Sequence, residues 1–132
     1  MIKEDQYSNL SANVRDLSIG YFGASTGAAA CIEASISSYS DRIYAIVSRG
    51  GRPDLAGYDD LNHVKAATLF IIGEKDDKEI ITLNKKALKQ LKKAKTKDLV
   101  IVPKAGHLFD EEPRLMEKVA DISLKWFSKN LL

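Results

Sequence analysis

The sequence contains few of the residues that form disulfides and structural metal sites. It has one cysteine, Cys31, and two histidines, His63 and His107, in 132 residues. A single cysteine cannot form an internal disulfide, and these three residues do not make a convincing structural zinc site. We therefore expect no metal.

Net charge and long apolar runs are also scarce. The 20 Lys and Arg residues nearly balance the 18 Asp and Glu residues, and the formal charge is +2. Nucleic-acid binders normally carry a basic excess that neutralises phosphates. No apolar stretch approaches the roughly 20 residues that span a bilayer, and the first residues, MIKEDQ, hold no hydrophobic signal core. We expect no nucleic-acid partner, no membrane partner and a cytoplasmic location.

The composition fits one globular domain over residues 1–132. Hydrophobic residues make up 45% of the chain and charged residues 29%, which is enough apolar material for a core. A chain of this length buries roughly two-thirds of its unfolded-state surface. A second full domain is not expected.

Four short apolar runs predict the strands of a parallel sheet. They cover residues 17–22, 43–47, 68–72 and 99–102. Each is apolar almost throughout rather than alternating, as strands covered on both faces require. Helix-length segments separate them, so the predicted class is α/β, with about four parallel strands flanked by helices on both faces.

Three helices are predicted from composition and spacing, at 25–38, 83–94 and 115–126. The first is rich in alanine and can lie close to a sheet. The second carries most of the lysine run at 85–97, seven lysines in thirteen residues, which we interpret as the solvated face of one helix. Binding to an acidic partner or to a membrane surface remains the alternative interpretation of that run.

Residues 23–27 read Gly-Ala-Ser-Thr-Gly and form a G-x-S-x-G motif directly after a predicted strand and before a predicted helix. We call this segment the serine turn. A tight turn between strand and helix crowds its neighbours, which predicts a need for glycine at both ends. It would expose Ser25 as a nucleophile and aim the Thr26 backbone N–H, at the positive end of the helix, toward an oxyanion.

Two further residues follow the third and fourth predicted strands. Asp76 comes after the run at 68–72, and His107 comes after the run at 99–102. Parallel strands place their carboxyl ends at one edge of the sheet, so both should lie near Ser25. The predicted arrangement has His107 as general base and acid and Asp76 as the carboxylate that orients it, with Asp77 as the less favoured alternative.

Arg49 and Arg52 follow the second strand on the same rim of the sheet. An arginine fork there could hold a substrate carboxylate, and pinning of the loop is an alternative that the sequence favours at least as much. No metal or organic cofactor is implied, because such a reaction needs only positioned protein groups.

Four stretches resemble the α/β-hydrolase superfamily, and within it dienelactone-hydrolase-like serine hydrolases. They are Gly20–Ala29, Ser48–Gly57, Thr68–Gly73 and Ala105–Phe109 with Glu112 and Pro113. The second resembles a serine-nucleophile subgroup that sometimes occurs fused to phosphoribosyltransferase domains. The resemblance implies hydrolysis of an ester, lactone or similar acyl bond in a small-molecule substrate, through an acyl-serine intermediate.

The resemblance covers only the C-terminal portion of such a fold, with the N-terminal strands absent. A complete member has about eight strands, and the loop that supplies the second oxyanion donor precedes the serine turn. We therefore expect weak or no activity from the isolated chain. We also expect residues 17–22 to present an unpaired apolar edge and an uncovered sheet face, which a second copy or a partner chain would cover. The alternatives to a hydrolase are a non-catalytic binding or assembly module, and a fragment of a longer or two-chain hydrolase.

Overall fold

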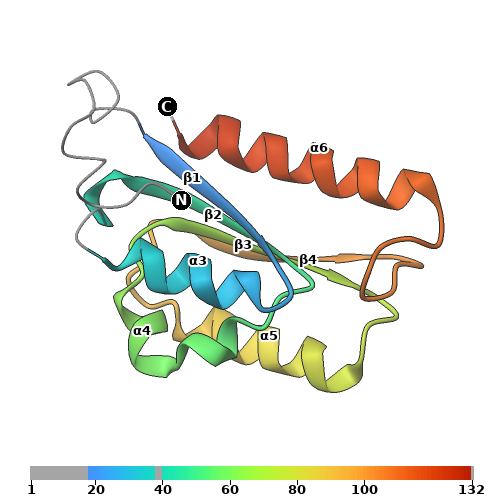
Figure 1. Ribbon diagram of the computed structural model, residues 1–132, viewed down its shortest axis with the longest axis horizontal. Helices are drawn as coiled ribbons and strands as arrows, with labels where there is room; N and C mark the ends of the chain where they lie inside the picture. The colour runs from blue at the N-terminus through green and yellow to red at the C-terminus, as the bar shows by residue number, and fades with distance from the viewer. Residues whose placement is uncertain (1–17, 38–39, 132) are drawn as a thin grey trace.

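The computed structural model describes residues 18–37 and 40–131, which form one sheet between two layers of helices (Figure 1). The strands are β1 (Ile19–Ala24), β2 (Ile43–Arg49), β3 (Ala67–Gly73) and β4 (Lys97–Val102). They lie in the order β1-β2-β3-β4, and each neighbouring pair is parallel. The predicted four-stranded parallel sheet is confirmed. Leu17, at the start of the first predicted strand, lies outside the described residues, as does Ser38 at the end of the first predicted helix.

Helices cover both faces of this sheet. Figure 1 shows α3 (Gly27–Ser35), α4 (Tyr58–His63) and α5 (Lys78–Gln90) on one face, with α6 (Pro113–Asn130) on the other. Two single-turn 3-10 helices complete the elements, η1 (Ser40–Arg42) and η2 (Pro53–Ala56). The predicted class is therefore confirmed as well. Among the described residues no helix is both long and apolar enough to cross a bilayer.

The two faces of the sheet bury separate apolar clusters. Ile32, Ile46 and Phe70 belong to the cluster beneath α3, α4 and α5, and Ile71 and Val119 belong to the cluster beneath α6. All seven residues of the interior strand β3 are buried. Burial on both faces explains why this strand is apolar throughout, because neither set of its side chains meets water.

The interpretation of the lysine run at 85–97 as the solvated face of one helix is wrong. Helix α5 ends at Gln90, and Lys92 to Lys97 lie in the following loop and at the start of β4. Leu91 is the residue that ends the helix: it leaves helical geometry and is fully buried in the core. On α5 itself, Lys86 places its ammonium over the ring of Tyr58 at 5.1 Å, and a hydrogen bond to Tyr58 raises the pKa of this lysine.

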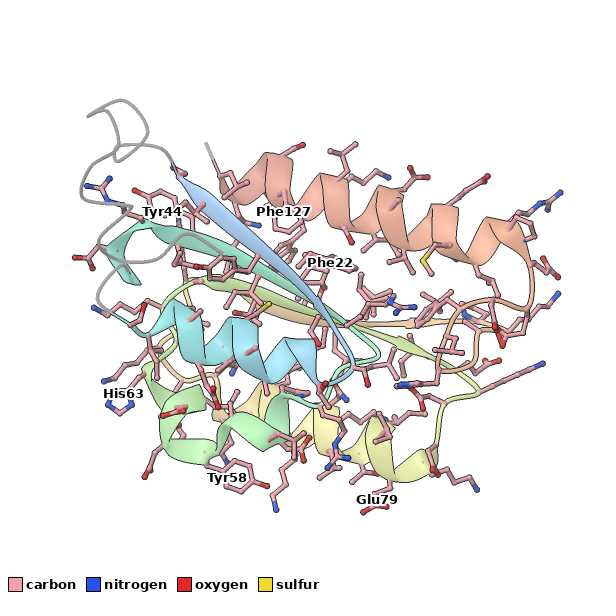
Figure 2. All side chains as sticks on the ribbon, viewed as in Figure 1. Phe22, Tyr44, Tyr58, His63, Glu79 and Phe127 are labelled. Carbon is pink, nitrogen blue, oxygen red and sulfur yellow. The ribbon has the colours of Figure 1, made fainter. Side chains whose placement is uncertain are left out.

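Strand β1 is an edge of the sheet, but its faces are not bare. Among the described residues it pairs only with β2. The ring of Phe127, labelled in Figure 2, packs over Gly20, where an added Cβ would lie 2.7 Å from it. On the other face Gly23 lies against α3. The expectation of an uncovered sheet face is therefore wrong at Gly20 and Gly23. The side chain of Phe22 remains 49% exposed.

Candidate active site

The serine turn leaves the sheet through a left-handed residue. Ser25 has a backbone φ of 52°, a left-handed conformation that residues other than glycine rarely adopt. Surrounding contacts must therefore maintain it. Its N–H donates to the Arg49 carbonyl at 3.3 Å, and its carbonyl accepts from the N–H groups of Ala28 at 3.3 Å and Arg52 at 3.0 Å. These bonds join the turn to α3 and to the loop after β2. They hold a strained backbone at the residue predicted to be the nucleophile.

Steric crowding requires glycine at only one end of the serine turn. A Cβ on Gly23 would lie 2.7 Å from the Gly27 carbonyl oxygen and 2.8 Å from Cys31 Sγ, whereas a Cβ on Gly27 would meet nothing within 4 Å. The prediction of crowding at both ends is therefore wrong for Gly27. The physical reason is its position as the first residue of α3, where the Cβ direction points away from the turn.

The thiol of Cys31 lies directly beneath the serine turn. Burial raises the pKa of this thiol, so the thiolate is disfavoured at neutral pH. Burial, and secondarily repulsion from Cys31 once its thiol has ionised, raise the pKa of Tyr21 on β1. Both groups are held in their neutral forms, in which they pack as ordinary partly buried side chains.

The loops after β3 and β4 bring His107 to Asp76. His107 Nδ1 lies 3.0 Å from Asp76 Oδ2, and the second carboxylate oxygen, Oδ1, accepts the Asp77 N–H at 2.7 Å. The Asp76 side chain is 3% exposed and that of His107 is 40% exposed. The carboxylate is thus buried behind a ring whose outer edge reaches solvent. Among the described residues, the carboxylate bonded to His107 is that of Asp76, and Asp77 is the residue before the start of α5.

Further contacts fix the loop that carries His107. The Lys75 N–H donates to the Ala105 carbonyl at 2.8 Å, which ties the loop after β4 to the loop after β3. Arg49 Nη1 donates to the Leu108 carbonyl at 3.1 Å, and the Arg49 guanidinium lies over the ring of Phe109, 5.5 Å from its centroid. Arg49 therefore holds this loop, which is one of the two roles considered for it from the sequence.

Arg52 is held by a carboxylate two residues away. Its Nε and Nη2 donate to the two oxygens of Asp54 at 3.0 and 2.9 Å. This paired hydrogen bond lowers the pKa of Asp54, against the opposing effect of burial, and raises the pKa of Arg52. Two of the five N–H groups of the guanidinium are used in this way, and the others are left for further contacts.

A cleft of about 590 Å³ brings most of the predicted residues together. Its lining consists of Ser25, Thr26, Arg52, Lys75, Asp76, Asp77, Ile80 and His107. Arg49 is not among these residues. Lys75 and Ile80 were not identified from the sequence, although both flank the acidic pair after the third strand. No group of three or more metal-ligating side chains occurs within residues 18–37 and 40–131.

Comparisons with known proteins agree on the fold. No protein-family profile matches the sequence. A dienelactone hydrolase from Anabaena variabilis is 43% identical, with a TM-score of 0.83, over 97% of this chain and 56% of that one. Est1E from Butyrivibrio proteoclasticus is 16% identical with a TM-score of 0.70, over 94% of this chain and 66% of that one. At that identity the second match concerns the fold alone.

Two curated relatives are longer proteins from strains of Mycobacterium tuberculosis. Each is 46% identical over 115 residues, which is 87% of this chain and 25% of the relative, and each carries phosphoribosyl transferase as a provisional name. The chain spans a quarter of their length and 56% of the dienelactone hydrolase. The sheet, its helical layers and the similarity over nearly all of this chain give it the α/β-hydrolase fold, in a form that is similar to a dienelactone hydrolase.

Proposed function

We propose that this chain carries the nucleophile of a hydrolase that cleaves an ester, lactone or similar acyl bond through an acyl-serine intermediate. Ser25 is the nucleophile, His107 the general base and acid, and Asp76 the orienting carboxylate. The observation that carries this proposal is the 3.0 Å contact between His107 Nδ1 and Asp76 Oδ2, beside a cleft that Ser25 also lines.

The contact between His107 and Asp76 supports one tautomer of the ring. Because a carboxylate only accepts, the proton sits on Nδ1 and leaves Nε2 as a base. Ser25 Oγ attacks the acyl carbon and gives its proton to Nε2, which passes it to the departing oxygen. Water then attacks the acyl-serine, again giving a proton to Nε2, and Ser25 is restored when that proton returns to Oγ.

Stabilisation of the tetrahedral intermediate is assigned to the start of α3. The Thr26 backbone N–H, at the positive end of that helix, is the proposed oxyanion donor. A single donor is typically worth about a hundred- to a thousandfold in turnover. Arg52, which lines the same cleft, is proposed to bind a negatively charged group of the substrate.

The exposed edge at β1 supports a proposal about assembly. Its six residues, IGYFGA, include no charged side chain, whereas the opposite edge strand β4 begins with exposed Lys97 and Asp98. Charged residues protect sheet edges from further pairing. We therefore propose that a second copy of this chain covers β1 across a two-fold axis.

Labelling with a fluorophosphonate tests the assignment of the nucleophile. The unaltered chain should be labelled, Ser25→Ala should not, and Ser37→Ala, which removes an exposed serine hydroxyl outside the cleft, should be labelled normally. Equal labelling of the unaltered chain and Ser25→Ala, or no labelling of either, would overturn the assignment. Hydrolysis of short acyl esters then measures turnover separately from acylation.

A non-catalytic binding module, or one part of a longer or two-chain hydrolase, is the second candidate. The observation that favours it is the span of this chain, 56% of the dienelactone hydrolase to which it is similar. Labelling of Ser25 without measurable ester turnover would favour this candidate. Phosphoribosyl transfer is not carried over, because the chain matches 25% of the relatives that bear that name.

A further inference from the structure

Asn84 is a fully buried amide in the middle of α5, a helix whose neighbouring positions carry lysines. Its Nδ2 donates two hydrogen bonds. One goes to the Ile80 carbonyl one helical turn earlier, at 2.8 Å, and the other crosses to the Gly51 carbonyl in the loop after β2, at 3.0 Å. Buried polar side chains are stable only when they are hydrogen-bonded. The bond to Ile80 lies within α5, whereas the bond to Gly51 joins α5 to a different segment of the chain.

The loop that receives this bond lies against the serine turn. Gly51 is buried, and a Cβ there would lie 2.5 Å from Cβ of Ala28, so the loop backbone has no room to move toward α3. The next residue, Arg52, donates its N–H to the Ser25 carbonyl at 3.0 Å. The loop is therefore fixed on one side by the serine turn and on the other by Asn84.

The two carbonyls that Asn84 joins belong to two segments that both contribute residues to the cleft. Ile80 lines the cleft from α5, and Arg52, next to Gly51, lines it from the loop. A side chain at position 84 must donate two hydrogen bonds to reach both the Gly51 and the Ile80 carbonyls. A leucine of similar size has none, an aspartate only accepts, and a serine has one donor on a shorter side chain.

We propose that Asn84 is a positioning residue that fixes the Gly51–Arg52 loop and thereby sets the preference of the cleft for substrates with a negatively charged group. This inference rests on the proposed function, because Arg52 is the group proposed to bind that charge. Without Asn84 the Gly51 carbonyl is a buried acceptor with no donor, and a loop in that state shifts or opens to water. The guanidinium then loses its fixed position in the cleft.

Two esters with the same leaving group separate this role from general stability. Para-nitrophenyl acetate is neutral, and para-nitrophenyl hydrogen succinate carries a carboxylate. In Asn84→Leu we expect KM for the succinate ester to rise about tenfold, the size of one lost hydrogen bond to a charged group, with kcat and the acetate kinetics nearly unchanged. Arg52→Gln should raise KM for the succinate ester at least as much, and the double variant should add no further loss.

Asn84→Ser and Asn130→Leu complete the set of variants. A serine at 84 can still bond to the helix carbonyl but is too short to reach Gly51, so it should repeat the effect with less risk to folding. Asn130 is a buried amide that donates to Trp126 O in α6, one turn earlier at 2.8 Å, and does not line the cleft. Asn130→Leu should keep the ratio of the two KM values.

Native-state hydrogen exchange at the Arg52 amide gives a readout that does not need activity. That exchange should accelerate about tenfold in both Asn84 variants, relative to the Phe70 amide in β3, and not in Asn130→Leu. Unchanged Arg52 exchange in both Asn84 variants, or an unchanged KM ratio in an active chain, overturns the inference. If the unaltered chain hydrolyses neither ester and Ser25 is not labelled, the proposed function fails, and the exchange result alone decides whether Asn84 fixes the loop.

Discussion

The acidic pair Asp76-Asp77 contains two carboxylates that the sequence alone separates poorly, and the structure gives them different surroundings. Asp76 is buried with both oxygens engaged, one by His107 and one by the Asp77 N–H. Asp77 is exposed at the start of α5. The two carboxylates are chemically identical but differ in position. Only Asp76 is hydrogen-bonded to His107, so only Asp76 can fix the tautomer of the imidazole ring.

Replacing each aspartate by asparagine should therefore give unequal results. In Asp76→Asn an amide faces Nδ1, which favours the wrong tautomer, and we expect Ser25 labelling to slow by about a thousandfold or more. In Asp77→Asn the backbone N–H that bonds to Asp76 is kept, and labelling should stay within about a factor of three. Labelling rates measured with a fluorophosphonate compare the two directly. A larger loss in Asp77→Asn would identify Asp77 as the orienting residue.

The two glycines of the serine turn should differ in stability when each is replaced by alanine. Gly23→Ala forces a methyl group against backbone and should lower the free energy of unfolding by about 1–3 kcal/mol. Gly27→Ala places a methyl group in open space at the start of α3 and should raise it by about 0.5–1 kcal/mol, because alanine reduces the freedom of the unfolded chain. Urea unfolding measures both. Equal destabilisation would show that crowding acts at both ends.

At the scale of elements, the four strands could be predicted because strands that are buried on both faces have almost continuous apolar sequences. Strand β1 begins at Ile19 and continues to Ala24, so the serine turn starts inside the strand rather than after it.

The end of α5 could not be predicted, because Leu91 and Ala94 keep helical spacing with Ala87. Both still pack against the core after the chain has left the helix, and spacing does not distinguish a turning chain from a continuing helix.

The η2 segment should respond to pH through its ion pair. Arg52 holds the pKa of Asp54 below its usual value of about 3.9. The folded state therefore binds this proton more weakly than the unfolded state. The stability that the pair contributes is fully present above the unfolded value and is lost as pH falls through the lower folded value. Relative to Asp54→Asn, the unaltered chain should keep a constant advantage in urea midpoint above about pH 5 and lose it below about pH 4.

Asp98 offers a matched control for that measurement, because its carboxylate accepts only the N–H of Leu99 and it is exposed. Over the same range, from about pH 5 down to about pH 3, the difference in urea midpoint between the unaltered chain and Asp98→Asn should show no comparable loss. An advantage over Asp54→Asn that persists unchanged to pH 3 would contradict the assignment of Arg52 as the cause.

For the whole molecule, sequence reasoning could place Ser25, Asp76 and His107 at one edge, because parallel strands direct their carboxyl ends together. It could not divide the roles of Arg49 and Arg52. Arg49 ends β2 and Arg52 follows it, but Arg49 bonds to Leu108 across 59 residues whereas Arg52 lines the cleft. It also missed Asn84, since a polar residue directly before two lysines on a helix looks solvent-exposed until the loop after β2 is in place.

The uncharged edge at β1 leads to the last prediction, which concerns assembly. Phe22, labelled in Figure 2, is 49% exposed on this strand, and Ile101 on the opposite edge strand is 39% exposed. If a second copy covers β1, light scattering at micromolar concentration should give twice the mass of the chain. Phe22→Glu should halve that mass, because a charge at the centre of a two-fold interface meets its own copy. Ile101→Glu should leave it unchanged, and a monomer mass for the unaltered chain would contradict the dimer.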